Sequence, residues 1–318
     1  MKEQPLVSII IPTYNRAHLI GETLDSILAQ TYTNWECIVV DDDSTDHTDK
    51  VLAKYCVKDT RFQYFHRPKD RLPGGNAARN YGFELSKGYY IQWFDDDDIM
   101  LPNYLSSRMS VIDTSTNLCM LSGKLVDEYK NDIRDLKWFN DDTLYRQYVL
   151  KLSEILSPSV LFKRQFLNKK VLFNEALFRS QEAEFFSRVF FNLNTSEYKQ
   201  IPEIGFLYRQ HQQTKSFTDN TYNSGYKKAH FLVHQTNWNQ AIIIKDKEII
   251  KYCYKKIIIL LFETIRAKDT MLFKEILRYL KKHVKPLLFF KIKSSLYLIL
   301  WTNTQGYKFK PYLLNQNL

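Results

Sequence analysis

The sequence contains few cysteines, and none of them are closely spaced. Cys37, Cys56, Cys119 and Cys253 lie far apart, and no C-x-x-C pair occurs. Neither a disulfide framework nor a zinc site built from paired cysteines is therefore indicated. The first residues also lack the apolar segment and small-residue cleavage site of a secretory signal peptide. We therefore expect a cytoplasmic protein.

Two common nucleotide-binding signatures are absent. The apolar run at residues 7–11 is followed by PTYNRAHLIG, which has no glycine before Gly21, and no Walker A sequence occurs anywhere. These absences argue against a typical dinucleotide-dependent dehydrogenase and against P-loop chemistry. The glycine-rich segment LPGGNAARN at residues 72–80 could be a simple turn. It could also bring backbone amides and Arg79 close to a phosphate.

The body of the chain has no excess of positive charge, and the net positive charge lies at its end. The 318 residues are 44% hydrophobic, which is enough for a globular core, and carry a net charge of +10. Residues 241–318 contain 16 Lys+Arg and 5 Asp+Glu, whereas residues 1–240 contain 29 and 30. We therefore expect a main domain over residues 1–240 and a basic, aromatic, helical extension over residues 241–318.

The first hundred residues alternate between strand and helix patterns. We expect strands at residues 7–11, 35–40, 61–67 and 88–95, with helices at residues 19–30, 44–55 and 76–85. This alternation predicts an α/β sheet with much parallel pairing. Ligands bind such sheets beyond the carboxyl ends of the strands.

Polar or acidic segments follow three of these strands, at residues 12–16, 41–43 and 95–98. Each acidic run, taken alone, could be a solvated turn. Because both acidic runs follow strands of one sheet, we expect a negatively charged pocket there. Carboxylate oxygens suit Mg²⁺ or Mn²⁺, and phosphate oxygens often complete the coordination shell. The implied ligand is a metal-bound phosphate compound.

Four segments in this order, VSIIIPTYNR, IVVDDDST, GGNAARN and FDDDDIMLP, resemble a family 2 glycosyltransferase with the GT-A fold over about residues 5–215. The resemblance implies a mixed, mostly parallel sheet flanked by helices. It also implies a nucleotide-binding half at about 1–115 and an acceptor half at about 116–240. Such enzymes transfer a sugar from a nucleoside diphosphate donor, commonly a UDP-sugar, with inversion and with a divalent metal, Mn²⁺ or Mg²⁺.

The resemblance assigns donor-binding roles to particular residues. Asp42 would accept a hydrogen bond from the uracil N–H. Asp43 stands where the family more often has glycine. The other residues implied on the nucleoside or diphosphate side are Pro12, Thr13, Tyr14, Arg16, Gly75, Asn76 and Arg79.

The acidic run FDDDD aligns with the family's D-x-D motif. Asp97 would bind the metal, and Asp95 would face the ribose or a metal-bound water. Asp96 holds the variable position and could share the work of Asp95. Asp98 would cap the following helix.

The general base is implied by SQEAEFFSRVF, where Glu182 replaces the more frequent Asp and Glu184 is the rival. The closing segment YRQH implies that His211 contacts the metal or diphosphate and that Arg209 contacts the phosphates. Ser157 and Ser159 would lie on the acceptor side.

The basic extension has helical spacing. Its longest apolar run, residues 286–301, is interrupted by Lys291 and Lys293 and is short of the roughly 20 residues needed to span a bilayer. Two interpretations stay open: peripheral contact with the inner face of the membrane, or a helical subdomain packed on the main domain. No motif supports nucleic-acid binding.

We therefore expect a metal-dependent inverting glycosyltransferase of bacterial polysaccharide biosynthesis, with a UDP-sugar donor and a glycan or lipid-linked acceptor. One alternative is a non-catalytic relative that binds nucleotide sugars. The other is a glycoside hydrolase, which needs two carboxylates that flank the sugar.

Overall fold

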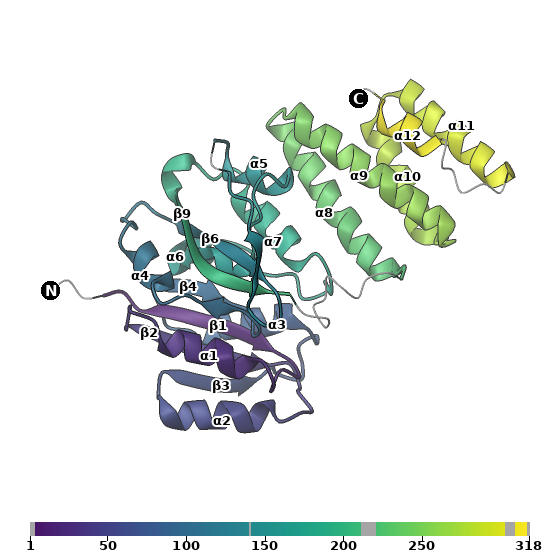
Figure 1. Cartoon of the computed structure of the whole chain (residues 1–318). Coiled ribbons are helices and arrows are strands. Elements are labelled where there is room, and N and C mark those ends of the chain that lie inside the picture. Colours follow the sequence, from purple (N-terminus) through teal and green to yellow (C-terminus); the bar gives the residue numbers. More distant parts are fainter. Residues whose placement is uncertain (1–3, 140, 211–220, 303–308, 317–318) are drawn as a thin grey trace. The chain divides into compact units, whose positions relative to one another are not determined.

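The computed structural model describes residues 4–139, 141–210, 221–302 and 309–316 (Figure 1). The chain forms two compact units, Met1–Thr218 and Asp219–Leu318. The expected boundary at residue 240 falls inside helix α8 (Ser224–Ile243), so the division lies earlier in the chain. The excess of positive charge begins only after this division, which is why charge alone places the boundary too late.

The first unit is organised around one nine-stranded sheet with the order β3-β2-β1-β4-β8-β6-β9-β5, and β7 pairs with β6. The strands are β1 (Val7–Thr13), β2 (Trp35–Asp41), β3 (Phe62–His66), β4 (Tyr90–Trp93), β5 (Ile99–Met100), β6 (Leu118–Val126), β7 (Asp132–Asp135), β8 (Val160–Lys163) and β9 (Tyr198–Arg209).

Parallel pairing holds for the first part of the sheet and is mixed beyond it. Strands β1 to β4 pair in parallel, whereas β8 lies antiparallel to both β4 and β6. Strand β6 pairs in parallel with β9, and β5 and β7 are antiparallel to their neighbours. The expected mixed, mostly parallel α/β sheet is confirmed, because the parallel strand pairs contain most of the paired residues among the described strands.

Helices cover both faces of the parallel part. Helices α1 and α2 pack on one face, where Leu24 and Leu52 share a core with Ile9 and Val39. Helix α3 lies on the other face, where Gly82 comes so close to β1 that a Cβ there would meet Ile10 Cγ2 at 2.4 Å. The helices of this unit are α1 (Ile20–Leu28), α2 (Thr48–Lys58), α3 (Gly75–Leu85), α4 (Tyr104–Met109), α5 (Leu144–Val149), α6 (Arg164–Leu167) and α7 (Gln181–Phe190).

A polar stripe on α1 holds the segment that follows β4. The Thr23 hydroxyl donates to the carbonyl oxygens of Asp96 (3.1 Å) and Asp98 (2.8 Å), and the Ser26 hydroxyl accepts from the backbone N–H of Met100 (3.1 Å). Gln30, just past the end of α1, donates to the Leu101 carbonyl at 2.8 Å. The backbone of the acidic segment is therefore fixed from beneath by side chains of α1.

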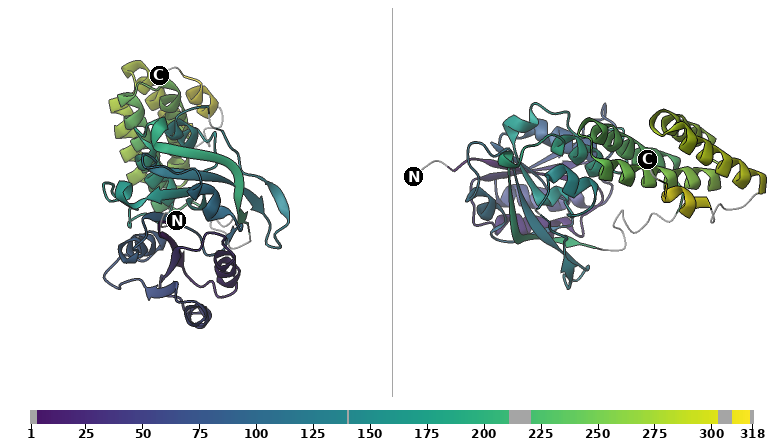
Figure 2. Two further views of the ribbon diagram at one scale, coloured as in Figure 1. Left: turned by 90° about the vertical axis from the view of Figure 1, so that its left-hand side faces the viewer. Right: turned by 90° about the horizontal axis from the view of Figure 1, so that it is seen from above.

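The second unit is helical in its described part. Its helices are α8 (Ser224–Ile243), α9 (Lys247–Arg266), α10 (Thr270–His283), α11 (Pro286–Thr302) and α12 (Phe309–Leu314). Helices α8, α9 and α10 run side by side (Figures 1 and 2). Their core includes Trp238, which packs edge-on against Tyr254 and Tyr279. Within the described residues, no helix combines the length and the apolar character that crossing a bilayer requires.

Candidate active site

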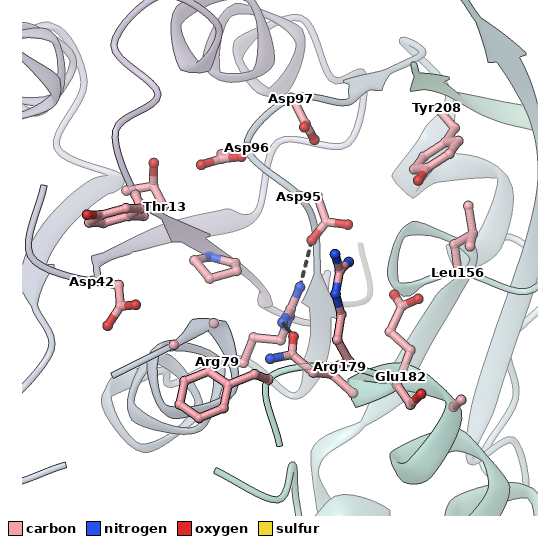
Figure 3. Close-up of a pocket in the computed structure, with 18 of the residues that line it drawn as sticks. Thr13, Asp42, Arg79, Asp95, Asp96, Asp97, Leu156, Arg179, Glu182 and Tyr208 are labelled. Carbon is pink, nitrogen blue, oxygen red and sulfur yellow. Dashed lines mark hydrogen bonds and ion pairs between the residues drawn. The ribbon is translucent and has the colours of Figure 1, made fainter. Parts of the chain in front are cut away.

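A cavity of about 480 Å³ opens at the carboxyl ends of β1, β2 and β4. Figure 3 shows Asp95 and Arg79 between Asp42 on one side and Glu182 on the other. The N-terminal ends of α3 and α7 also reach the lining, through Gly75 and Gln181. The cavity is therefore where the sequence predicts ligand binding for this kind of sheet.

The three acids after β2 have different surroundings. Asp41 is buried and accepts hydrogen bonds from the Tyr64 hydroxyl (2.7 Å) and the Ser44 backbone N–H (2.8 Å). Asp43 has a left-handed backbone conformation (φ 74°) and an exposed side chain. Of the three, only Asp42 lines the cavity. The residue implied to read the nucleobase is thus the one that faces the open space.

Arg67, whose side chain is largely buried, holds the carboxylate of Asp42 in place. Arg67 Nε donates to Asp42 Oδ1, and the same guanidinium donates to the carbonyl oxygens of Pro68 (2.9 Å) and Arg71 (2.7 Å). Arg67 is not a lining residue of the cavity. It therefore acts on the cavity through Asp42.

The acidic run after β4 is divided in a similar way. Asp95 receives a hydrogen bond from Arg79 Nη2 at 2.8 Å, and Asp96 lies 3.6 Å from Arg16 Nε, measured to its Oδ1. Asp97 also lines the cavity. Asp96 also lines the cavity, on the side of Thr13 (Figure 3).

The fourth acid, Asp98, does not cap a helix, contrary to the expectation. Its side chain is fully buried, and Oδ1 accepts from the backbone N–H of Arg209 at 3.0 Å. Helix α4 begins at Tyr104, after Asn103, and that cap position makes no side-chain hydrogen bond. Asp98 instead ties the acidic run to β9, a contact between residues far apart in the sequence.

Burial and mutual repulsion raise the pKa values of carboxyl groups in this region. The pKa of Asp96 rises to about 7, because burial and the neighbouring charge of Asp97 outweigh the opposing effects of Thr13 and Arg16. Burial, and then Asp97 and Asp95, raise the pKa of Asp98 well above its usual range. Burial is the larger cause of both shifts, and the neighbouring carboxylates add to it.

Glu182, at the start of α7, is held by the segment before β8. The backbone N–H of Ser157 donates to Glu182 Oε1 at 2.6 Å, and the Ser157 hydroxyl donates to the same oxygen. Burial and the charge of Asp95 raise the pKa of Glu182, while the Ser157 hydrogen bonds and Arg79 oppose the rise. A carboxylate with one oxygen fixed and a raised pKa is suited to accept a proton.

The rival acid, Glu184, has a structural role. Its carboxylate pairs with Arg188 at 2.5 Å, and Arg188 also donates to the carbonyl oxygens of Val171 (2.7 Å) and Leu172 (2.8 Å). Glu184 does not line the cavity. Through Arg188, Glu184 therefore connects α7 to the loop at Val171 and Leu172.

Most of the residues implied for the site meet in this cavity. Those that line it are Pro12, Thr13, Tyr14, Arg16, Asp42, Gly75, Arg79, Asp95, Asp96, Asp97 and Glu182.

Asn76 and Arg209, also implied for the donor side, are not among the described residues of the cavity wall. Asn76 is buried and donates to the carbonyl oxygens of Asn174 (2.7 Å) and Leu177 (3.3 Å). The Arg209 guanidinium pairs with Glu22 at 3.1 Å. His211, implied for the metal or diphosphate, lies outside the described residues.

Several lining residues were not predicted from the sequence, among them Tyr148, Lys151, Phe178, Arg179 and Tyr208. Tyr208 lies in the YRQH segment and Arg179 lies three residues before Glu182. Both could therefore have been predicted from their closeness to these motifs. Tyr148 and Lys151, at the end of α5, carry no local signal and reach the cavity only through the fold.

The donor set fits a divalent cation that shares its shell with a ligand. Asp95 and Asp97 present carboxylate oxygens to one cavity, and burial and the neighbouring charge of Asp97 raise the pKa of Asp96. Within the described residues, no group of three or more His, Cys, Asp or Glu side chains could hold a metal alone. This fits Mg²⁺ or Mn²⁺ bound by one or two carboxylates with phosphate oxygens.

Residues 8–192 match the family model for glycosyl transferase family 2. An uncharacterized glycosyltransferase of Rickettsia felis is 34% identical over 199 residues, which cover 58% of this chain and 31% of that protein. The UDP-Glc:alpha-D-GlcNAc-diphosphoundecaprenol beta-1,3-glucosyltransferase WfgD of Escherichia coli is 37% identical over 107 residues, which cover 34% of this chain and 41% of that protein. The matched region spans 31% and 55% of the length of the R. felis relative and its R. typhi counterpart.

Among solved structures, S. aureus TarS 1-349 in complex with UDP-GlcNAc superposes with a TM-score of 0.62 at 18% identity, covering 79% of this chain and 72% of that one. This likeness concerns the fold. The family match covers more than half of the chain and includes residues 8–13 of β1, strands β2 to β8, the acidic segments and Glu182. The chain therefore belongs to glycosyl transferase family 2 and has the GT-A fold.

Proposed function

We propose that this chain is an inverting glycosyltransferase that moves a sugar from a UDP-sugar to a hydroxyl group of a glycan or lipid-linked acceptor. The observation that carries the proposal is the single cavity that unites Asp42, the Asp95–Asp97 segment and Glu182. The names of two relatives from Escherichia coli support a role in bacterial surface polysaccharide biosynthesis. One is named for colanic acid biosynthesis, and the other for transfer to a sugar linked to diphosphoundecaprenol.

The nucleoside would lie along the end of β1. Asp42 would accept from the uracil N–H, with Arg67 holding its carboxylate in place. Tyr14, whose side chain is half exposed at the cavity, offers a ring to the base. We assign the ribose to Asp96, because it lies beside Thr13 and Arg16, while Asp95 is held by Arg79.

The diphosphate would lie near the N-terminal ends of α3 and α7 and near Arg79. Helix N-termini carry partial positive charge and favour anions. Asp97, with Asp95, would hold a divalent cation, which when bound neutralises the charge that develops on the departing diphosphate. Arg79, already positioned by Asp95, adds a fixed guanidinium to the same region.

Glu182 would act as the general base. Its Oε1 is occupied by Ser157, so Oε2 is the oxygen left to take the proton from the acceptor hydroxyl. Attack on the anomeric carbon from the side opposite the leaving diphosphate then gives inversion. The position of Glu182 in the cavity wall also argues against a non-catalytic relative, for which this side chain would have no need to face the donor.

The test is a screen of nucleotide sugars for transfer and for thermal stabilisation, with Mn²⁺ and with EDTA. We expect a UDP-sugar to stabilise the protein in the presence of Mn²⁺, and Asp97→Asn to abolish metal-dependent transfer while the fold persists. Full activity of Asp97→Asn would refute the metal assignment. Glycan hydrolysis without any UDP binding would instead identify a glycoside hydrolase.

We further propose that the enzyme works in the cytoplasm, at the inner face of the membrane. The four cysteines, all in the described part of the chain, are free thiols, which suits a reducing compartment.

A further inference from the structure

Helix α11 carries apolar side chains on two of its faces. Leu288, Ile292 and Leu296, spaced four residues apart, are buried. The helix packs against α10 and α12 within the second unit. This inner face accounts for the place of α11 in the fold.

The outer face of α11 also carries large apolar side chains, which are exposed among the described residues. Leu287, Phe290 and Tyr297 are 68%, 67% and 67% exposed, and Leu298 is 45% exposed. Separations of three, seven and eight residues bring these side chains to one side of a helix. They form a stripe along roughly three turns. Large apolar side chains gathered on one exposed face mark a surface that contacts something apolar.

The sequence around this stripe is rich in positive charge and contains no acidic residue. Between Ile276 and Leu318 there are eight Lys+Arg and no Asp or Glu. Lys281, Lys282 and Lys285 are exposed immediately before α11, and Lys293 is exposed within it. An apolar stripe bordered by lysines is complementary to a surface that is negative outside and apolar just beneath.

We propose that the exposed face of α11, defined by Leu287, Phe290, Tyr297 and Leu298, docks on an anionic lipid surface. The lysines would contact the headgroups, and the four apolar side chains would enter the boundary with the acyl chains. The helix has 17 residues and is not long enough to span a bilayer, so the contact is peripheral.

The same observations argue against a second copy of this chain as the occupant. Two copies meeting through α11 would bring together two segments that each contain eight Lys+Arg and no Asp or Glu. Anionic lipid, in contrast, gains about 1 kcal/mol from each nearby Lys or Arg. The inference uses only the second unit, so it does not depend on the proposed sugar transfer.

The test is flotation of the full chain with vesicles of phosphatidylcholine mixed with phosphatidylglycerol, compared with vesicles of phosphatidylcholine alone. We expect binding to the anionic vesicles that weakens with added salt. The double substitution Phe290→Ser with Tyr297→Ser should lower this binding about tenfold or more. The substitution Lys281→Glu with Lys282→Glu should lower it to a similar extent.

Matched controls come from helix α2 of the first unit. Val57 is 87% exposed there, and Lys50 and Lys54 are exposed on the same helix, so Val57→Ser and Lys50→Glu with Lys54→Glu make the same chemical changes elsewhere. These variants should bind vesicles like the unchanged protein. Because all substituted side chains are exposed, the melting temperature should stay the same and serves as the check on folding.

Three results would overturn the proposal. The first is equal binding to neutral and anionic vesicles, and the second is unchanged binding after Phe290→Ser with Tyr297→Ser. The third is a dimer, measured by light scattering, that dissociates in this double variant, because the stripe would then be a contact between two copies.

Discussion

Ser157 directs two hydrogen bonds to a single oxygen of Glu182, one from its backbone N–H and one from its hydroxyl. One carboxylate oxygen of the proposed base is thereby saturated and the other is left for the acceptor. The serine also opposes the rise in the pKa of Glu182 that burial and Asp95 cause. It thus acts on both the orientation and the protonation of the base.

Replacing Ser157 with alanine should slow transfer and shift its pH dependence. We expect kcat to fall about tenfold to a hundredfold, because the carboxylate loses a fixed orientation. Loss of a donor raises the pKa of Glu182 further, so the acid limb of the pH–kcat profile should move to higher pH. Ser157→Thr, which keeps the hydroxyl, should return the acid limb to its position in the unchanged enzyme. The affinity for UDP should not change in either variant. An unmoved acid limb in Ser157→Ala would contradict this role.

Glu182 and Glu184 should separate catalysis from stability. Glu182→Gln should lower kcat by about 10² to 10⁴ while UDP still binds, because a neutral amide cannot accept the proton. Glu184→Gln should instead lower the free energy of unfolding by about 1–3 kcal/mol, because Arg188 loses its charged partner. Its kcat per folded molecule should stay near that of the unchanged enzyme. Thermal melting and kcat, measured on both variants, test these two roles. A loss of kcat confined to Glu184→Gln would identify Glu184, and not Glu182, as the general base.

Arg67 should control recognition of the nucleobase through Asp42. Arg67→Gln should weaken UDP binding about tenfold and reduce its preference over CDP, because Asp42 loses the cation that orients it. Arg71→Gln is the control, since Arg71 pairs with Glu84, whose side chain is half exposed. Calorimetric titration with both nucleotides measures the effect. Lower thermal stability with an unaltered nucleotide preference would show that Arg67 only stabilises the loop whose carbonyl oxygens it contacts, at Pro68 and Arg71.

Asp96 should make the stability of the metal-free protein depend on pH. Its pKa is raised from 3.8 to about 7 in the folded state, so the folded protein binds this proton more tightly than the unfolded chain. The resulting stabilisation is complete below pH 3.8 and is lost as the pH rises through about 7. Asp96→Asn should therefore gain melting temperature relative to the unchanged protein between pH 4 and 8. A constant difference between the two proteins across this range, measured in EDTA, would contradict the shift.

Two glycines give a matched test of packing. A Cβ on Gly82 would meet Ile10 Cγ2 at 2.4 Å, so Gly82→Ala should cost about 1–3 kcal/mol of unfolding free energy. A Cβ on Gly21 in α1 would meet its nearest neighbour, the Tyr55 hydroxyl, at 3.6 Å. Gly21→Ala should therefore be neutral or stabilising by up to about 1 kcal/mol. Denaturant titration of both variants measures the difference, and equal losses would rule out the close approach of α3 to β1.

The parts of the site that local patterns control were predictable from the sequence. The run from Val7 to Ile11 is β-branched and ends at a proline, so the position of β1 and the loop after it follow directly. The acids after β2 and β4 must then meet at one edge, because parallel strands point the same way. This rule requires no knowledge of the remaining chain.

The division of work within each acidic run was not predictable, because it depends on backbone direction and on distant partners. Asp41 and Asp42 are neighbours, and the direction of the backbone at the end of β2 decides which of them faces the cavity. The role of Asp98 depends on its contact with Arg209, which lies more than a hundred positions away in the sequence. Asn76 has the spacing of a ligand-binding residue, but its amide is used by a loop that arrives about a hundred residues later. No local pattern reports such contacts.

The polar stripe of α1 has an energetic consequence for ligand binding. Thr23, Ser26 and Gln30 hold the backbone of the acidic segment through hydrogen bonds within the protein itself. The conformational entropy of that segment is therefore lost during folding and not when a nucleotide sugar arrives. A ligand that meets a preordered backbone retains more of its interaction energy as affinity.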